Sequence, residues 1–215
     1  MGLREQKKER TRRHIADTAW ALIADHGFGR VTVAEIARAA EVSEATVFNY
    51  FATKEDLFFF RLDQYGERLV RGVADRPAGE GVTAAFRRLL LANGGLIEQL
   101  ESDDRHTLDR LRTVNRVVAE SSALQGREQI SLTRTAELLA AALGGATAEE
   151  RLTARVVAHA LIAVQRALVL QVREAVLADG IPAGFADRLA QSAVDAFAML
   201  EQGFGNYGAQ GQASA

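Results

Sequence analysis

A short polar segment at residues 43–54 contains side chains suited to hydrogen bonding with a polyanion. Thr46, Asn49 and Tyr50 carry hydroxyl or amide groups, and Ala45 is small enough to let a groove approach the backbone closely. Groups of this kind donate to phosphate oxygens and to the base edges of DNA. The chemistry that the segment favours is therefore nucleic-acid recognition.

Two short helices separated by a turn would present these side chains. The first is predicted at about residues 33–40 from apolar residues at helical spacing, which are Val33, Ile36, Ala37 and Ala40. Ser43 is suited to cap a second helix at about residues 44–51, whose Val47 and Phe51 face inward. Because helices this short cannot bury a core alone, a third must cross them. A helix-turn-helix unit of this kind places its second helix in the major groove of DNA.

The rest of the pattern is also helical, so the predicted fold class is all-α. The third helix of the unit is expected at about residues 4–26, ended by Gly27 in the left-handed conformation. Thr53 and Asp56 form a variant capping box that starts a longer helix, which runs to about residue 74. Further helices are expected at about residues 82–100, 104–121, 123–143, 148–177 and 183–204.

The segment T-V-A-E-I-A-R-A-A-E-V-S-E-A-T-V-F-N-Y-F-A-T-K-E-D, residues 32–56, resembles the DNA-binding region of the TetR family of bacterial regulators. The match covers about residues 10–60 and depends on the helix order, the N-Y-F ending and the T-K-E-D start of the next helix. The resemblance implies a homodimer that binds double-stranded operator DNA at an inverted repeat. It also implies control of transcription by a small-molecule effector: repression that the effector relieves is the commoner outcome in such regulators, and activation is the alternative.

By this resemblance, nine residues contact the operator. Those placed at phosphates are Thr32, Ser43, Thr46, Tyr50 and Lys54. Those placed at bases are Glu44, Ala45, Phe48 and Asn49. Two positions depart from the family pattern. Glu41 stands where the family usually has glycine, so we expect a positive φ there at a cost of about 1 kcal/mol. Glu44 and Ala45 stand where Lys-Gly is common, so Glu44 either accepts from a cytosine amino group or points away.

Three of these residues have a structural alternative. Tyr50 can lie half-buried against the helix that starts at Thr53, and Phe48 can pack instead of touching a base. Lys54 can be a surface lysine in the first turn of a helix. A cation is unfavourable at that positive end of the helix dipole, which favours an external phosphate partner for Lys54.

The expected organisation is a DNA-binding domain at residues 1–56, a ligand-binding and dimerisation domain at 57–205, and a disordered tail at 206–215 rich in Gly, Ala and Gln. The helix at 148–177 carries two apolar stripes, and the closing helix at 183–204 is also strongly apolar. Such surplus apolar surface predicts that a second copy covers both helices.

Polar side chains on otherwise apolar helices are the candidates for an effector pocket: Tyr65, Arg112, Asn115, Arg116, His159, Gln165 and Arg166. Surface or dimer-interface polarity explains each of them equally well. The segment R-V-V-A-E-S-S-A-L-Q-G-R-E, residues 116–128, also resembles a C-terminal subgroup associated with acyl-CoA-like ligands. The effector is therefore expected to be a small apolar or amphipathic molecule, with an acyl-CoA-like compound as one candidate.

Enzymatic motifs are few. Asp103-x-x-His106 is a single copy of a spacing that di-iron bundles need in pairs, and no nucleophile elbow, phosphate loop or dinucleotide fingerprint occurs. The absence of cysteine excludes thiolate chemistry and disulfides. We therefore expect no catalytic site, metal or cofactor. A helical interaction module that does not bind DNA is the remaining alternative.

The charge distribution adds one feature. The net charge is only -2, but residues 1–13 contain six basic residues, so this stretch forms either an arm for a polyanion or a solvated helix start. No secretory signal is visible at the N-terminus, and the longest apolar run, about residues 156–164, is too short to cross a bilayer. A cytoplasmic protein outside the membrane is expected.

Overall fold

The computed structural model describes residues 2–92, 105–178 and 181–204, and within these ranges the chain is helical with no strand. The all-α prediction is confirmed. The helices are α1 (Leu3–His26), α2 (Val33–Ala39), α3 (Glu44–Tyr50), α4 (Lys54–Ala74), α5 (Val82–Leu91), α7 (Arg105–Ala119), α8 (Ser122–Leu143), α9 (Ala148–Leu177) and α10 (Phe185–Phe204). The tail predicted at 206–215 lies outside the described residues.

Side-chain caps start the helices that present the candidate DNA-binding surface. Thr32 and Glu35 form a full capping box at α2, and the Ser43 hydroxyl accepts from the backbone N–H of Thr46 at α3. Thr53 forms the predicted box with Asp56 at α4. Each cap satisfies backbone donors that the first helical turn leaves free. The predicted helix starts in this region are therefore confirmed to within a residue.

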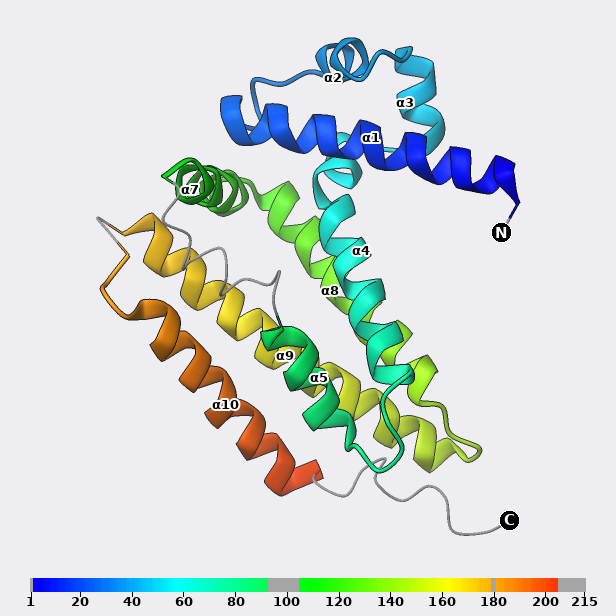
Figure 1. Ribbon diagram of the computed structural model, residues 1–215, viewed down its shortest axis with the longest axis vertical. Helices are drawn as coiled ribbons and strands as arrows, with labels where there is room; N and C mark the ends of the chain where they lie inside the picture. The colour runs from blue at the N-terminus through cyan, green and yellow to red at the C-terminus, as the bar shows by residue number, and fades with distance from the viewer. Residues whose placement is uncertain (1, 93–104, 179–180, 205–215) are drawn as a thin grey trace.

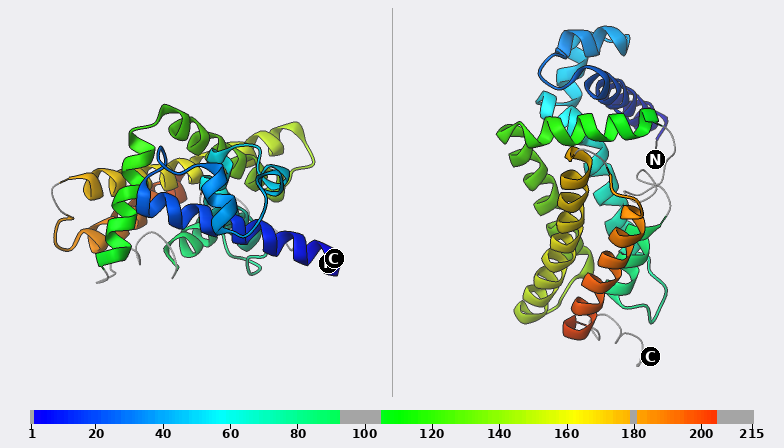
Figure 2. Two further views of the ribbon diagram at one scale, coloured as in Figure 1. Left: turned by 90° about the horizontal axis from the view of Figure 1, so that it is seen from above. Right: turned by 90° about the vertical axis from the view of Figure 1, so that its left-hand side faces the viewer.

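The helices form two parts joined by α4 (Figure 1). Helices α1–α3 lie together at one end, while α5, α8, α9 and α10 run lengthwise through the rest of the molecule. Helix α7 crosses beneath α1 at the top of this body, which is also seen in the right-hand view of Figure 2. Helix α4 packs on α1 at its start and on α8 and α5 further along, so it touches both parts.

Two hydrophobic clusters correspond to these parts. The N-terminal cluster contains Ile15, Ile36 and Val47 from α1–α3, together with residues 57–60 of α4. The body cluster is built from α4, α5 and α7–α10, and Phe86 is one of its fully buried members. Because the first turns of α4 are buried in the N-terminal cluster, α4 is a shared element rather than the start of an independent domain.

Helix α5 is shorter than predicted. It ends at Leu91, and Ala92 takes extended backbone with φ -65° and ψ 157°, so a single helix over 82–100 is wrong. The sequence continues with Asn93 and two glycines, which are poor helix formers. Gly27 also differs from expectation: its φ of 85° is positive, but its ψ of 150° is extended rather than left-handed helical.

Helix α9 is, among the described residues, the one helix long and apolar enough to cross a membrane by length and composition. The expectation based on the run at 156–164 alone was therefore too narrow. The structure nevertheless packs α9 against α8, α7, α10 and α5, and buries Val157, Leu161 and Leu168 among others. A core helix passes the same compositional test, and this packing accounts for the apolar residues on the inward side of α9.

Candidate DNA-binding surface and effector cavity

Helix α3 has one buried side, which anchors it, and one exposed side. Val47 is 1% exposed and fixes the helix on the N-terminal cluster. The four residues expected at bases, which are Glu44, Ala45, Phe48 and Asn49, are all exposed. Phe48 is 54% exposed, an unusual state for a large apolar side chain, so the structure does not support the packing alternative for it.

The hydroxyl-bearing candidates have local partners. Thr32 Oγ1 lies 2.8 Å from Glu35 Oε2, and Ser43 Oγ lies 2.8 Å from Thr46 Oγ1. Tyr50 is half-buried against the N-terminal cluster, as the structural alternative described. Contacts of these residues with phosphates stay predictions, since no DNA is present.

The turn between α2 and α3 has the predicted backbone strain. Glu41 has a φ of 55°, the one positive value at a non-glycine residue in the described part of the chain. The turn is held because the N–H of Val42 donates to the carbonyl of Ala37 at 2.9 Å. A side chain in this region of φ costs about 1 kcal/mol.

Lys54 has partners inside the protein. Its Nζ donates to the carbonyl oxygens of Phe28 at 2.9 Å and Val31 at 3.0 Å, and it lies 4.1 Å from the centre of the Phe28 ring. The helix dipole therefore gives no reason to require an external phosphate, because carbonyl dipoles and an aromatic face already stabilise the ammonium. A contact of Lys54 with phosphate stays a prediction. Lys54 ties the α1–α2 loop to the start of α4.

The basic N-terminal stretch follows the first half of α1. Arg4, Lys7, Lys8 and Arg10 are exposed and form no ion pair within the described residues. Arg12 instead packs its guanidinium over Phe51 and Phe60, at 5.4 and 4.9 Å from the ring centres. These four basic residues thus form a solvated cationic arm on the part of α1 that projects from the end of the molecule (Figure 1).

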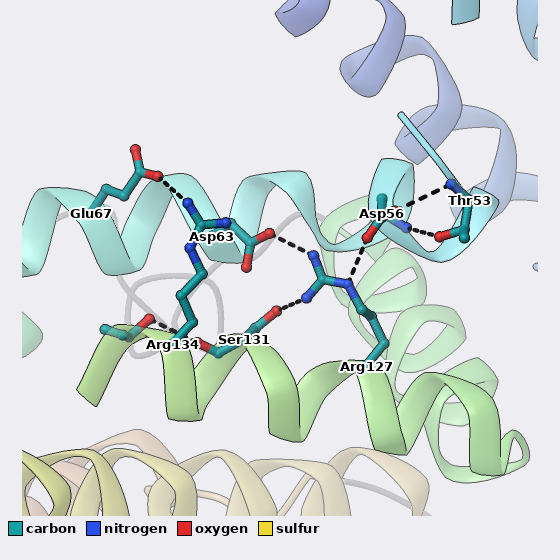
Figure 3. Close-up of polar contacts among 8 residues, drawn as sticks. Thr53, Asp56, Asp63, Glu67, Arg127, Ser131 and Arg134 are labelled. Atoms are coloured by element: carbon teal, nitrogen blue, oxygen red, sulfur yellow. Dashed lines mark hydrogen bonds and ion pairs between the residues drawn. The ribbon is translucent and has the colours of Figure 1, made fainter. Parts of the chain in front are cut away.

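An ion-pair network joins α8 to the start of α4 (Figure 3). Arg127 Nε lies 2.8 Å from Asp56 Oδ1 and its Nη2 lies 2.7 Å from Asp63 Oδ2, while Nη1 contacts Ser131. Burial works against ionisation of Asp56, but hydrogen bonds from Arg127 and Thr53 outweigh it and hold its pKa below the ordinary value. Since Asp56 also belongs to the capping box of α4, Arg127 contacts a residue that stabilises the start of the helix following α3.

A second junction surrounds the single tryptophan, on α1. The guanidinium of Arg61 on α4 lies 4.7 Å from the Trp20 ring centre, and that of Arg110 on α7 lies 5.8 Å from it. Arg61 is paired with Asp17 at 3.0 Å and Arg110 with Asp25 at 3.2 Å. These contacts fasten α1 to both α4 and α7.

A cavity of about 830 Å³ lies below this junction, with walls from α1, α4, α5, α7, α9 and α10. Two predicted effector residues line it, Tyr65 and Gln165. Gln165 is only 5% exposed, and its Oε1 has no hydrogen-bond partner among the described residues. Burial raises the pKa of the Tyr65 phenol.

The other five candidates do not line the cavity. Asn115 is buried, but it donates to the carbonyl of Leu111 and accepts from Arg173. His159 faces Glu137 at 3.1 Å on the outside of α8 and α9. The remaining three are arginines. Arg116 and Arg166 are exposed, whereas Arg112 is partly exposed and lies 3.5 Å from Asp109.

Sequence reasoning missed the polar residues that α4 contributes to the cavity. They are Arg61, Gln64, Arg68 and Arg71, in addition to Tyr65. Their spacing of three and four residues places them on one helical face. That periodicity was visible in the sequence, but the apolar positions of α4 dominated the pattern.

A shallow groove of about 410 Å³ runs between α9 and α10 on the outside of the body. Its lining is mostly small, with Ala160, Ala163, Ala167 and Ala196 among the residues. Larger apolar side chains are also exposed on these two helices: Leu152, Val156, Leu170, Leu177, Val194 and Met199. These are the helices on which a second copy was predicted to pack.

Helix α3 is capped, has an exposed polar side and packs with α1 and α2, and α4 joins this unit to a helical body with a cavity. This arrangement defines a helix-turn-helix protein of the DNA-binding class. Residues 15–59 match the family model described as bacterial regulatory proteins of the tetR family. Over this region the chain is similar to the TetR family of transcriptional regulators.

Curated relatives match part of the chain. The regulator TcmR of Streptomyces glaucescens is 36% identical over 93 residues, which cover 41% of this chain and 41% of TcmR. The regulator HbdR of Aromatoleum sp. (strain CIB) is 32% identical over 85 residues, 38% of this chain and 34% of HbdR. The matches therefore span less than half the length of these two relatives, both of which are described as HTH-type transcriptional regulators.

Solved structures share the whole fold. A TetR-family regulator from Mesorhizobium loti gives a TM-score of 0.53 at 18% identity, over 91% of this chain and 96% of that one. NalD of Pseudomonas aeruginosa, described as the secondary repressor of the MexAB-OprM multidrug efflux pump, gives 0.51 at 23% identity, over 87% and 97%. At this level of identity the likeness concerns the fold.

Proposed function

We propose that this protein is a cytoplasmic transcriptional repressor that binds an inverted-repeat operator as a homodimer and is released by a small apolar or amphipathic effector. The observation that carries the proposal is the exposed side of α3, where a 54% exposed phenylalanine stands beside Asn49 on a helix anchored by Val47. A rigid helix with this arrangement suits the major groove. Candidates for the effector include an acyl-CoA-like compound.

The exposed side of α3 and the caps of α2 and α3 support the following roles on the DNA. Asn49 and Phe48 read bases, because an amide can bond adenine and an aromatic edge can contact a thymine methyl. Thr32, Ser43, Thr46 and Tyr50 position the unit on phosphates, which fix its register but carry no sequence information. The cationic arm of α1 adds contacts that depend on salt.

The homodimer places two such surfaces on one operator. The α9–α10 face supplies the contact, because its alanine-lined groove and exposed apolar residues match the surface that an isologous dimer buries. A twofold dimer presents its recognition helices to two half-sites, so the operator is an inverted repeat.

Release by an effector follows from the position of the cavity. Its walls include α4, which begins directly after α3, and α1, which crosses the recognition unit. A ligand that fits one tilt of α4 better than another shifts the separation of the two recognition helices. The coupling is reciprocal, so operator DNA weakens effector binding by the same factor.

The test is a DNA-binding measurement with the full chain and two exposed substitutions. Phe48→Ala combined with Asn49→Ala is expected to abolish preference for an operator taken from the gene's own upstream region. Ile130→Ala is the matched control, because Ile130 is 62% exposed on α8, away from α3. If the double variant binds the operator as tightly and selectively as the unaltered chain, α3 is not the reading helix.

A further inference from the structure

We infer that the cavity takes an amphipathic anion, a molecule with an apolar chain, an acidic group at one end and a hydrogen-bond donor along its length. This inference rests on the proposed function only in treating the same cavity as the effector site. Three observations carry it: the charge at the rim, the apolar interior and one unsatisfied buried oxygen.

The charge of the lining is strongly unbalanced. Five arginines and one aspartate line the cavity: Arg13, Arg61, Arg68, Arg71, Arg110 and Asp17. Three of the arginines are neutralised by partners, namely Glu9, Asp17 and Asp25. Arg68 and Arg71 form no ion pair within the described part of the chain.

These two arginines form the anion-binding part of the lining. They are exposed and stand three residues apart on α4, so their guanidinium groups share one side of the helix. The guanidinium of Arg68 lies 5.7 Å from the Tyr65 ring centre, a contact that leaves its donors available. Two neighbouring cations repel each other, and a carboxylate or phosphate between them relieves that repulsion with charge-assisted hydrogen bonds.

The deeper wall is apolar. It includes Leu111, Leu168, Leu189 and Ala193, all of them buried side chains of α7, α9 and α10. An aliphatic chain placed here is removed from water while its acidic end stays at the arginines. The lining therefore selects both ends of an amphipathic molecule.

Gln165 adds a requirement within this apolar wall. Gln165 is only 5% exposed and lines the cavity, and its Oε1 has no hydrogen-bond partner among the described residues. A buried amide oxygen without a donor is unfavourable, so a ligand hydroxyl or N–H at this depth gains affinity that an unsubstituted chain does not.

The fluorescence of Trp20 can be used to measure ligand binding in the cavity. Trp20 is the only tryptophan of the chain and lines the cavity, so its fluorescence reports occupancy directly. The full chain, without DNA, is titrated with decanoate, decanol, decylamine, decanoyl-CoA and two hydroxydecanoates with the hydroxyl at carbon 3 or carbon 10. Calorimetry confirms each dissociation constant.

We expect decanoate to bind about tenfold or more tightly than decanol and decylamine, since hydrogen bonds to charged groups are the stronger ones. Arg68→Gln with Arg71→Gln removes this preference and leaves decanol unchanged. The matched control is Arg116→Gln, an exposed arginine on α7 outside the cavity. Gln165→Leu removes any advantage of a hydroxydecanoate over decanoate. Comparison of decanoyl-CoA with decanoate tells whether a phosphate-bearing carrier or a free carboxylate supplies the anion.

Equal binding of acid, alcohol and amine overturns the inference, as does unchanged decanoate affinity in the double arginine variant. Failure of decanoate and decanoyl-CoA to bind at all also overturns it. Operator binding is measured on the same preparation without ligand. Ligand binding without operator binding contradicts the proposed function alone, whereas operator binding without ligand binding contradicts this inference alone.

Discussion

Replacement of Arg127 by methionine tests whether the junction between α8 and α4 stabilises the fold. Methionine keeps an unbranched apolar stem like that of arginine but removes both ion pairs. The Arg127 side chain is 16% exposed and that of Asp63 is 14% exposed, so the pair lies largely out of water. Asp63 Oδ1 already lacks a partner within the described chain, and the substitution leaves its other oxygen without one as well.

The expected loss follows from that burial. Breaking one side of a buried ion pair costs about 3–5 kcal/mol, because the remaining charge is uncompensated. The residual exposure of both partners places our expectation at the lower end, about 3 kcal/mol. For a chain of this size such a change lowers Tm by roughly 6–12 °C. A second substitution, Asp63→Leu, removes the stranded charge and is expected to recover about 1–3 kcal/mol.

The assay is denaturant and thermal unfolding at one protein concentration, since a dimer's stability depends on it. Arg134→Met is the matched control on the same helix, because its pair with Glu67 is 57% and 41% exposed and spans 3.4 Å. Exposed pairs contribute about 0–1 kcal/mol and are screened by salt. The reasoning is refuted if Arg127→Met lowers the free energy of unfolding no more than Arg134→Met does. It is also refuted if adding Asp63→Leu to Arg127→Met restores no stability.

Three further predictions concern stability. Gly66→Ala should lose about 1–3 kcal/mol, because its Cβ collides with the Thr135 side chain, and Thr135→Ala should restore most of it; Gly126→Ala on open surface is the control and should be neutral or stabilising in the same unfolding assay. Glu41→Gly should raise stability by up to about 1 kcal/mol by relieving the positive φ, and a lowered Tm would contradict this. The pKa of Asp56 is held low in the fold, so its contribution is complete above the unfolded value and lost as pH falls; unfolding followed below about pH 4 should be less pH-dependent in Asp56→Asn.

The local structure of the DNA-binding unit was predictable because its signals are local. Thr32, Ser43 and Thr53 each cap the helix that follows within a few residues, and all three caps are present. The positive φ at Glu41 was predictable for the same reason, since it depends on the length of one turn. The limits of α9, Ala148–Leu177, match the prediction because Thr147 caps it and a loop follows.

Long-range partners were not predictable. Lys54 was predicted to lie unfavourably beside a helix start, but carbonyl oxygens 23 and 26 residues earlier in the chain accept hydrogen bonds from its ammonium. No pattern within α4 indicates them, because they depend on where the α1–α2 loop is folded. The same holds for Arg127, whose partners lie 64 and 71 residues away.

The cavity shows how the folded structure distinguishes polar residues that look alike in sequence. Gln165 and Arg166 are neighbours on α9, yet the first is buried against the cavity and the second is exposed. One residue along a helix turns the side chain by about 100°, so a small error in the direction of the body reverses which of the two faces inward. Arg68 and Arg71 avoid this ambiguity only because three-residue spacing keeps them together whichever way α4 is turned.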